Sequence, residues 1–273
     1  MSTNANLNLN IDVNDLVKTI LSLVQRIGRA EFVQRLLHEL ENKVRGRCDI
    51  LIISYSQLQR CQNTLLNSER TQSARWEQGL DGHDFAVFFF HGGMFDHGGE
   101  DGGYINWAFT GGNRYPSPWG FHDRDSYVVW ANRTNLVGGN GGGNDYAIYF
   151  HKKTIDRIVV KKDWDRGKRI HHVAAIYFCF RNIGNSQQMI GKNQRESQTF
   201  IFQPNDTIQR IGVKHEHGLI NAIKFYVRNS YDGHERESDW MGGNGGHEHV
   251  FAESPKGIFG RHGIYLDSLG IFY

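Results

Sequence analysis

The stretch that decides the fold is the C-terminal segment GIFGRHGIYLDSLGIFY, residues 257–273. Two runs of alternating hydrophobic residues flank a glycine-containing turn at residues 260–263, a pattern typical of two strands joined by a tight loop. Glycine permits positive φ and leaves room for another group to approach closely. Gly263 and Asp267 form a GxxxD pattern, which places one carboxylate beside a backbone without a Cβ atom. We expect a shallow, polar, preformed pocket at this hairpin.

Upstream of this hairpin, strand pairs and glycine-rich loops recur back to Val137. The motif GGNGG occurs at residues 138–142 and 242–246, and the strand endings AAIYFCF, NAIKFYV and DSLGIFY follow in that order. A reversal between paired strands is predicted near Arg166 and Gly167. Hydrophobic strand pairs without a helical period between them predict an internal threefold repeat, in which each unit forms one four-stranded sheet.

These motifs resemble those of the jacalin-related lectins. The resemblance covers residues 137–273 and implies a mainly β fold, a β-prism of three four-stranded Greek-key sheets, preceded here by an α-helical N-terminal arm. In that family a sugar lies between the GxxxD loop of the last unit and the glycine-rich loop of the first. The resemblance therefore implies these carbohydrate-binding residues: Gly138, Gly139, Gly141, Gly263, Ile264, Tyr265 and Asp267. An ionised Asp267 would accept hydrogen bonds from two vicinal hydroxyls, and backbone amides would donate in return.

The resemblance also bears on the number of sites and on the sugar. At the positions that we align with Asp267, the first unit has His172 and the second has Asn221, so we expect one sugar site. Galactose-preferring members of the family use a free N-terminus made by processing, whereas here a long extension precedes Val137. Mannose or glucose is the expected ligand. Binding of one monosaccharide should be roughly millimolar, so useful affinity requires several sites on one oligomer.

The hydrophobic pattern of residues 1–75 predicts a helical arm. Hydrophobic residues recur there at spacings of three and four, which indicates at least two amphipathic helices: Leu16, Ile20, Leu23, Ile27, Phe32, Leu36, Leu37, Leu40 and Val44. Asp12 or Asn14 would cap the first helix, and Gly28 either separates the two helices or lies inside one. The segment from Leu51 to Leu66 fits helix or strand. We expect this arm to pack on the next domain or to form a homo-oligomer, the alternative being a membrane-active arm in a lectin-targeted pore-forming toxin.

Residues 76–136 are predicted to be a Gly/His/aromatic-rich β or loop region of unknown family. A strand is expected from Phe85 to Phe90, followed by a solvated glycine-rich loop. The region carries seven residues of metal-binding types, but they match no known ligand spacing: His83, Asp84, His91, Asp96, His97, Glu100 and Asp101. A structural role is preferred, with a metal site as the alternative. The aromatic residues favour core or interface positions over sugar stacking: Tyr104, Trp107, Tyr115, Trp119, Tyr127 and Trp130.

No catalytic pattern stands out. The HEH triplets at residues 215–217 and 247–249 each put two imidazoles on one face of a strand, but neither has an obvious third metal ligand. No serine lies in a nucleophile elbow, and Cys179 falls inside an apolar strand, where a buried inert thiol is expected. We therefore predict a protein that is not an enzyme, with no cofactor and no bound metal.

Composition limits the partners. The net charge of +2 is too small to indicate nucleic acid or an anionic membrane, and three cysteines in 273 residues make no disulfide framework. No signal peptide or long apolar run occurs, so a cytoplasmic protein is expected, with non-classical release possible. The expected partners are glycans or glycoproteins. Beside the lectin and toxin hypotheses stands a third, a structural or self-assembling protein that uses the β-prism as a scaffold.

Overall fold

The computed structural model describes residues 9–23, 27–78, 81–97, 105–115, 127–165, 167, 170–181, 187–191 and 196–273. The chain divides into two compact units, an N-terminal unit (Met1–Ser117 with Phe121–Trp130) and a C-terminal unit (Pro118–Gly120 with Ala131–Tyr273). Five of the residues singled out above lie outside the described residues: Glu100, Asp101, Tyr104, Trp119 and Arg166.

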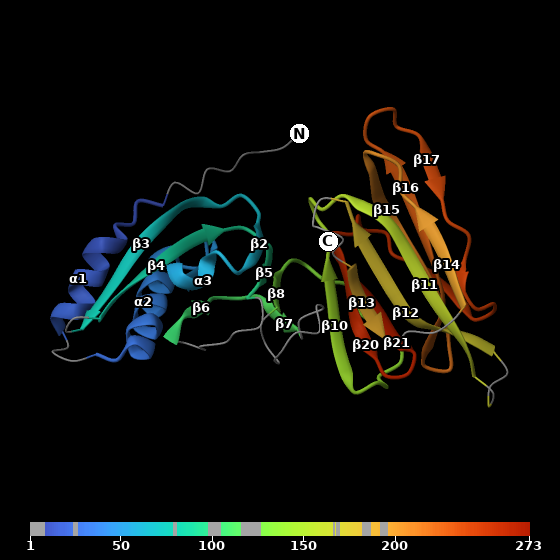
Figure 1. The fold of residues 1–273 in the computed structure, drawn as a ribbon, viewed down its shortest axis with the longest axis horizontal. Helices are drawn as coiled ribbons and strands as arrows, with labels where there is room; N and C mark the ends of the chain where they lie inside the picture. Colours follow the sequence, from blue (N-terminus) through green and yellow to red (C-terminus); the bar gives the residue numbers. More distant parts are fainter. Residues whose placement is uncertain are drawn as a thin grey trace. The chain divides into compact units, whose positions relative to one another are not determined.

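The N-terminal unit begins with two helices, α1 (Val13–Leu23) and α2 (Arg29–Val44) (Figure 1). The Oδ1 atom of Asp12 accepts hydrogen bonds from the amides of Asn14 and Asp15 at 2.9 and 3.2 Å, so Asp12 caps α1. Gly28 precedes α2 as its N-cap in extended conformation. Gly28 therefore separates the two helices, the first of the two possibilities left open by the sequence.

Two four-stranded sheets complete the N-terminal unit. The first has the order β3-β4-β1-β6, with β3 Glu69–Gln78, β4 Asp81–Phe90, β1 Asp49–Ser54 and β6 Trp107–Phe109. The second has the order β2-β5-β8-β7, with β2 Gln62–Leu65, β5 Gly93–Asp96, β8 Tyr127–Trp130 and β7 Asn113–Tyr115. The short helix α3 (Tyr55–Leu58) lies between β1 and β2, so the ambiguous segment from Leu51 to Leu66 contains both strand and helix.

The apolar faces of α1 and α2 are buried inside their own unit. One hydrophobic cluster joins both helices to the first sheet, and its members include Phe32 and Leu36 of α2 and Phe85 of β4, all with no exposed area. Burial of apolar side chains at this spacing is the main source of stability for short helices. Within the described residues, no helix has the length and apolar character that a membrane span requires.

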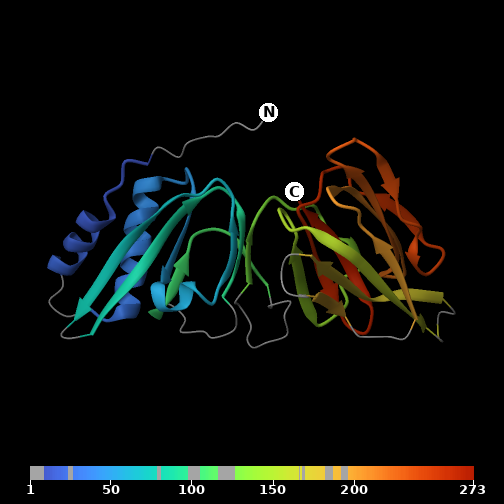
Figure 2. The same ribbon diagram turned by 45° about the horizontal axis from the view of Figure 1, so that its top comes forward.

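The C-terminal unit contains three antiparallel sheets (Figures 1 and 2). The first has the order β10-β20-β21-β9, with β10 Asn144–Tyr149, β20 Gly257–His262, β21 Leu266–Phe272 and β9 Val137–Gly138. The second has the order β13-β12-β11-β14, with β13 Gln187–Gly191, β12 Ile170–Phe180, β11 Ile155–Asp165 and β14 Glu196–Ile201. The third has the order β17-β16-β15-β19, with β17 Glu235–Glu237, β16 Leu219–Asn229, β15 Asp206–Glu216 and β19 His247–Val250.

The strand connections refine the predicted threefold repeat. In the second sheet, β14 returns beside β11 and completes a Greek key, and β19 does the same beside β15. The third sheet has a fifth strand, β18 (Met241–Gly242), which also pairs with β16. The first sheet joins β9 and β10 to the last two strands of the chain. The sequence suggested that the repeat units are consecutive segments, and for this sheet that expectation was wrong. Pairing over this sequence separation leaves no local signal.

All three sheets enclose one hydrophobic core. It takes the inward residues of each sheet, such as Ile148 and Leu269 of the first, Ile158 and Phe178 of the second and Phe225 of the third. Strand alternation brings every second side chain to the same face, so one core can collect residues from all three sheets. This arrangement is a β-prism, as predicted. Cys179 is buried, and burial raises the pKa of its thiol, which matches the inert role expected for it.

Candidate functional site

The closing hairpin consists of β20, β21 and the three-residue loop Gly263–Ile264–Tyr265. The amide of Gly263 donates to the carbonyl of Tyr265 at 2.9 Å. The strand β20 continues to His262, so the turn begins at Gly263, three residues later than the predicted start at Gly260. Opposite it, the pairing shifts at Asp267, which occupies a β-bulge. Bulges redirect side chains, and this one turns Asp267 toward the glycine-rich loop 138–142.

The glycine-rich loop 138–142 is fixed to the backbone of β21. Gly138 pairs with Ser268, and the amide of Gly139 donates to the carbonyl of Asp267 at 2.8 Å. Gly138 has φ of +110°, and a Cβ atom there would lie 2.3 Å from the Asp267 carbonyl oxygen. Only glycine fits this approach. Gly138 and Gly139 thus position the loop, and the amide of Gly139 is already engaged in doing so.

Three other glycines surround the Asp267 carboxylate. A Cβ atom on Gly141 would lie 2.4 Å from Oδ1, and one on Gly142 would lie 2.6 Å from Oδ2. A Cβ atom on Gly263 would lie 3.8 Å from Oδ2 and 3.6 Å from the Cα atom of Gly142. The two loops therefore meet at the carboxylate of Asp267. Only 9% of this residue is exposed. Gly142, which has φ of +77°, is a site residue that sequence reasoning missed although it lies inside the GGNGG motif.

Arg261 holds the two loops together. Its Nη1 atom donates to the carbonyl of Asn140 at 2.8 Å, and its Nε atom lies 3.4 Å from Oδ1 of Asp145. The ion pair is exposed, so it contributes at most about 1 kcal/mol, and the hydrogen bond to the loop matters more for geometry. Neither Arg261 nor Asn140 was predicted as a site residue. An arginine that bonds a backbone carbonyl 121 positions away gives no pattern in the sequence.

Beneath the loop, a buried tyrosine supports β21. The hydroxyl of Tyr146 donates to the carbonyl of Ser268 at 2.9 Å. Burial, and secondly the charge of Asp267, raise the pKa of Tyr146, so it stays a neutral donor. Ser268 follows Asp267 directly, and this bond therefore fixes the backbone that carries the carboxylate.

Ile264 and Tyr265 face different surroundings. The Ile264 side chain is 56% exposed at the tip of the loop. The Tyr265 ring packs on His172 with centroids 5.2 Å apart. The amides of Ile264 and Tyr265 donate no hydrogen bond within the described part of the chain, and such amides are available to a ligand. All seven predicted residues thus lie at the junction of the two loops. Gly138 and Gly139 act there mainly as supports, and Tyr265 offers its amide while its ring packs on His172.

Strand register identifies the residues equivalent to Asp267 in the other two sheets. The bulge that holds Asp267 recurs at Asn221 between β15 and β16, and at Ala174 between β11 and β12. Glycines confirm the equivalence, because a Cβ atom on Gly242 would touch the Asn221 carbonyl oxygen and one on Gly191 would touch that of Ala174. Asn221 was predicted correctly. His172 was not: it lies two residues before the bulge, a shift that alternation alone cannot detect.

Asn221 and His172 instead form a buried polar pair. Nδ1 of His172 and Oδ1 of Asn221 are hydrogen-bonded at 2.8 Å, and neither residue has exposed area. Asn221 also donates through Nδ2 to the carbonyl of Gly245 at 3.4 Å, in the second glycine-rich loop. The position equivalent to Asp267 is therefore an internal contact in the third sheet, and Ala174 offers no polar group in the second.

The histidine-rich stretches have structural partners. His83 bonds Arg29 and stacks on Trp76, and His97 is buried with Nε2 at 2.7 Å from Oε1 of Gln57. In the HEH triplets, His215 is the cross-strand partner of His247. No group of three His, Cys, Asp or Glu residues suited to a metal ion occurs in the ranges that the structure describes.

Comparisons with known proteins concern the C-terminal unit as a whole. The Jacalin-like lectin domain family matches residues 134–272. The solved structure of the Calystegia sepium agglutinin is 17% identical and covers 52% of this chain and 95% of its own, with a TM-score of 0.41. A Malaysian banana lectin is 19% identical and covers 52% of this chain and 96% of its own, with a TM-score of 0.40. A mannose-specific jacalin-related lectin from Morus nigra, in complex with mannose, is 17% identical and covers 52% of this chain and 93% of its own, with a TM-score of 0.40. No curated protein matches the chain.

Proposed function

Because this chain belongs to the Jacalin-like lectin domain family through residues 134–272, we propose that it is a lectin that binds mannose-type or glucose-type sugars at the closing hairpin. One observation carries the proposal: the Asp267 carboxylate lies between two loops, where Cβ atoms on Gly141, Gly142 and Gly263 would lie 2.4–3.8 Å from its oxygens. A carboxylate accepts hydrogen bonds from two vicinal hydroxyls, and the absence of Cβ atoms lets a pyranose ring approach it closely.

The amide donors of the site come from the hairpin loop. The amides of Gly139 and Gly263 already bond to carbonyls of this unit, at 2.8 and 2.9 Å. We assign the amides of Ile264 and Tyr265 as the groups that donate to the sugar oxygens. The exposed side chain of Ile264 then borders the ring and lets the site distinguish the substituents around it.

The preference for mannose or glucose rests on the chain before β9. In galactose-preferring family members a free N-terminus contributes to the site, whereas here residues 131–136 continue into the strand. The amide of Thr134 donates to the carbonyl of Ile271 at 3.1 Å, so this segment is held along β21. A free amino group at this position is therefore absent from the proposed site.

Self-association would raise the affinity of a millimolar site. We propose that the protein acts as an oligomer that associates through α1 and α2, with residues 137–273 as the sugar-binding domain. The predicted arm of residues 1–75 is not helical throughout, because β1, α3, β2 and part of β3 also lie in it. The apolar residues of α1 and α2 are buried within the N-terminal unit, so association through these helices would use their exposed polar faces. Multivalent sites on one particle increase avidity by ~10²- to 10⁴-fold without any new contact.

A glycan array with the full-length protein tests the proposal. We expect mannose-type or glucose-type ligands to bind, and the Asp267→Ala variant to lose them while keeping its melting temperature within a few degrees. Glu253→Ala, which removes an exposed carboxylate elsewhere on the same unit, is the matched control and should bind like the wild type. A blank array from folded protein, or binding that persists in Asp267→Ala, would refute the lectin and favour the scaffold hypothesis.

The toxin hypothesis has a separate test. The cluster that buries the apolar residues of α1 and α2 would have to open before either helix could enter a bilayer. Dye-loaded liposomes bearing mannosylated lipid should therefore stay intact with the full-length protein, whereas release would support the toxin. Deleting residues 1–75 is not a clean variant, because it removes β1, which lies between β4 and β6 in the first sheet.

A further inference from the structure

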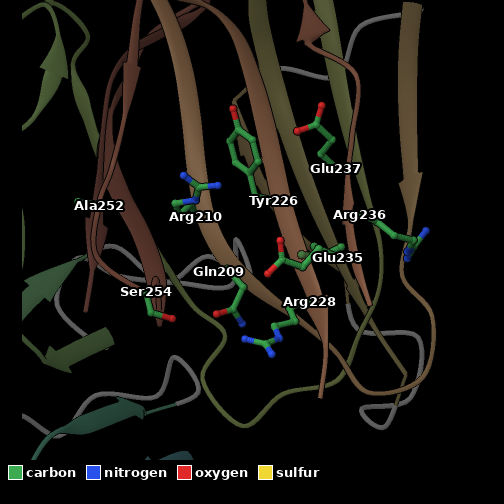
Figure 3. Close-up of a pocket in the computed structure, with 10 residues that line it drawn as sticks. Gln209, Arg210, Tyr226, Arg228, Glu235, Arg236, Glu237, Ala252 and Ser254 are labelled. Atoms are coloured by element: carbon green, nitrogen blue, oxygen red, sulfur yellow. The ribbon is translucent and has the colours of Figure 1, made fainter. Parts of the chain in front are cut away.

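A polar cavity lies on the C-terminal unit, on the outer face of the third sheet, and shares no lining residue with the loop site. Its volume is about 560 Å³, within the ~300–1,000 Å³ typical of small-molecule sites. Figure 3 shows Gln209, Arg228 and Glu235 grouped near Arg210 and Tyr226, with Ser254 on the opposite wall. The residues come from β15, β16, β17 and the segment that follows β19.

A β-bulge creates this concentration of polar groups. The pairing of β15 with β16 shifts between Ile208 and Arg210, which leaves Gln209 as the extra residue. Ile208 and Ile211 are both buried, so the two residues between them both point outward. A regular strand would turn one of these side chains into the core. The bulge thus puts an amide and a guanidinium side by side on one face.

Some charges of the cavity are neutralised and others are not. Arg236 pairs with Asp206, and Glu237 pairs with Lys224 at 2.7 Å. Within the described residues, by contrast, no ion pair involves Arg210, Arg228 or Glu235, although Arg228 and Glu235 are cross-strand neighbours. The cavity therefore retains two guanidinium groups and one carboxylate.

Arg210 is held in a defined orientation. Its guanidinium carbon lies 4.7 Å from the centroid of the Tyr226 ring, and the two residues are register partners on β15 and β16. Stacking on an aromatic face leaves the edge of a guanidinium free to donate two parallel hydrogen bonds, the geometry that a carboxylate matches. Arg210 is thus preorganised to bind an acid group.

The other polar side chains that line the cavity determine which neutral groups of a ligand can bind beside its acid group. Gln209 can donate and accept, Glu235 accepts, and Ser254 does both, which suits hydroxyl groups. Glu235 would repel a dianion such as a phosphate ester, whereas a singly charged carboxylate can lie on the arginine side of the cavity.

We propose that this cavity binds an acidic saccharide, with the sugar carboxylate between Arg210 and Arg228 and the ring hydroxyls on Gln209 and Glu235. The site lies toward the ends of β15 and β16 far from their connecting turn, and it uses no residue of the glycine-rich loops. It is therefore independent of the sugar site at Asp267.

NMR titration of the full-length protein with glucuronic acid tests this assignment. We expect saturable binding with a Kd on the order of millimolar, the range of a small polar ligand in an open site. Arg210→Gln and Arg228→Gln should each weaken it by about tenfold or more. Lys214→Gln removes one positive charge from the same face of β15, so it controls for net charge and should stay within twofold of the wild type. Asp267→Ala should also leave glucuronic acid binding unchanged.

Two competitors separate the ligand classes. Glucose and sodium sulfate, each at the concentration of glucuronic acid and at constant ionic strength, should displace it only weakly. Equal competition by sulfate would overturn the saccharide assignment, because the cavity would then respond to charge alone. Unchanged binding in both arginine variants, or loss of binding in Asp267→Ala, would overturn the location.

Discussion

Replacing Gly141 with Ala should abolish sugar binding at the closing hairpin while leaving the fold intact. The added Cβ atom would lie 2.4 Å from Oδ1 of Asp267, whereas ordinary contact begins at 3.4 Å. Asp267 or the loop must therefore move by about 1 Å. Gly141 is exposed, and its φ is not among the positive values, so alanine causes no backbone strain.

The expected loss follows from hydrogen-bond geometry. A shift of about 1 Å takes hydrogen bonds from ~2.7 Å to beyond ~3.5 Å, where they no longer count as bonds. Hydrogen bonds to a charged group contribute roughly 1.5–3 kcal/mol each. Loss of the two bonds to vicinal hydroxyls therefore costs about 3–6 kcal/mol, which weakens Kd by at least roughly 100-fold. A millimolar ligand would become undetectable.

Gly143→Ala is the matched control, because a Cβ atom at Gly143 would meet nothing within 4 Å. Isothermal titration or NMR with methyl mannoside measures binding, and thermal unfolding by circular dichroism measures stability. Both variants should melt within a few degrees of the wild type, and only Gly141→Ala should lose binding. Wild-type affinity in Gly141→Ala would refute a site at the Asp267 carboxylate, and so would equal losses in the two variants.

Three further predictions concern stability and reactivity. Asn221→Ala removes the 2.8 Å hydrogen bond to the buried His172, so urea denaturation should show a loss of about 1–3 kcal/mol; a change below about 0.5 kcal/mol would mean that this pair is not structural. Leu36→Ala should cost about 2–5 kcal/mol, whereas Gln34→Ala, its exposed neighbour on α2, should change little; equal effects would contradict the packing of this helix. Burial raises the pKa of Cys48 to about 11 and that of Cys61 to about 12, above the ordinary 9.0. The folding stability contributed by the two protonated thiols is therefore fully present below pH 9 and is lost as the pH rises through 11 to 12. Iodoacetamide at pH 8 should therefore alkylate both thiols far more slowly in the native than in the urea-unfolded protein, and equal rates would contradict their burial.

The outcome of the sequence predictions depended on how local the signal was. Capping of α1 by Asp12 and the strands of the closing hairpin were readable, because each depends on residues a few positions apart. The turn of that hairpin was placed too early, since β20 continues through His262. His172 was misaligned by two residues, because a bulge changes the register without changing the hydrophobic alternation.

The sequence by itself determined the strand pairs, the glycine-rich loops and the carboxylate at the closing hairpin, because alternation, glycine positions and the GxxxD pattern are all local properties; the β-prism was implied by the resemblance of these motifs to those of the jacalin-related lectins. Only the tertiary structure decided what surrounds that carboxylate. Gly142 lies beside Asp267, and Arg261 bonds the glycine-rich loop 138–142. Both contacts exist because β9 and β10 pair with the last two strands, more than a hundred residues away. Such pairing depends on which sheet edges remain open after the core has formed, and no short stretch of sequence records that.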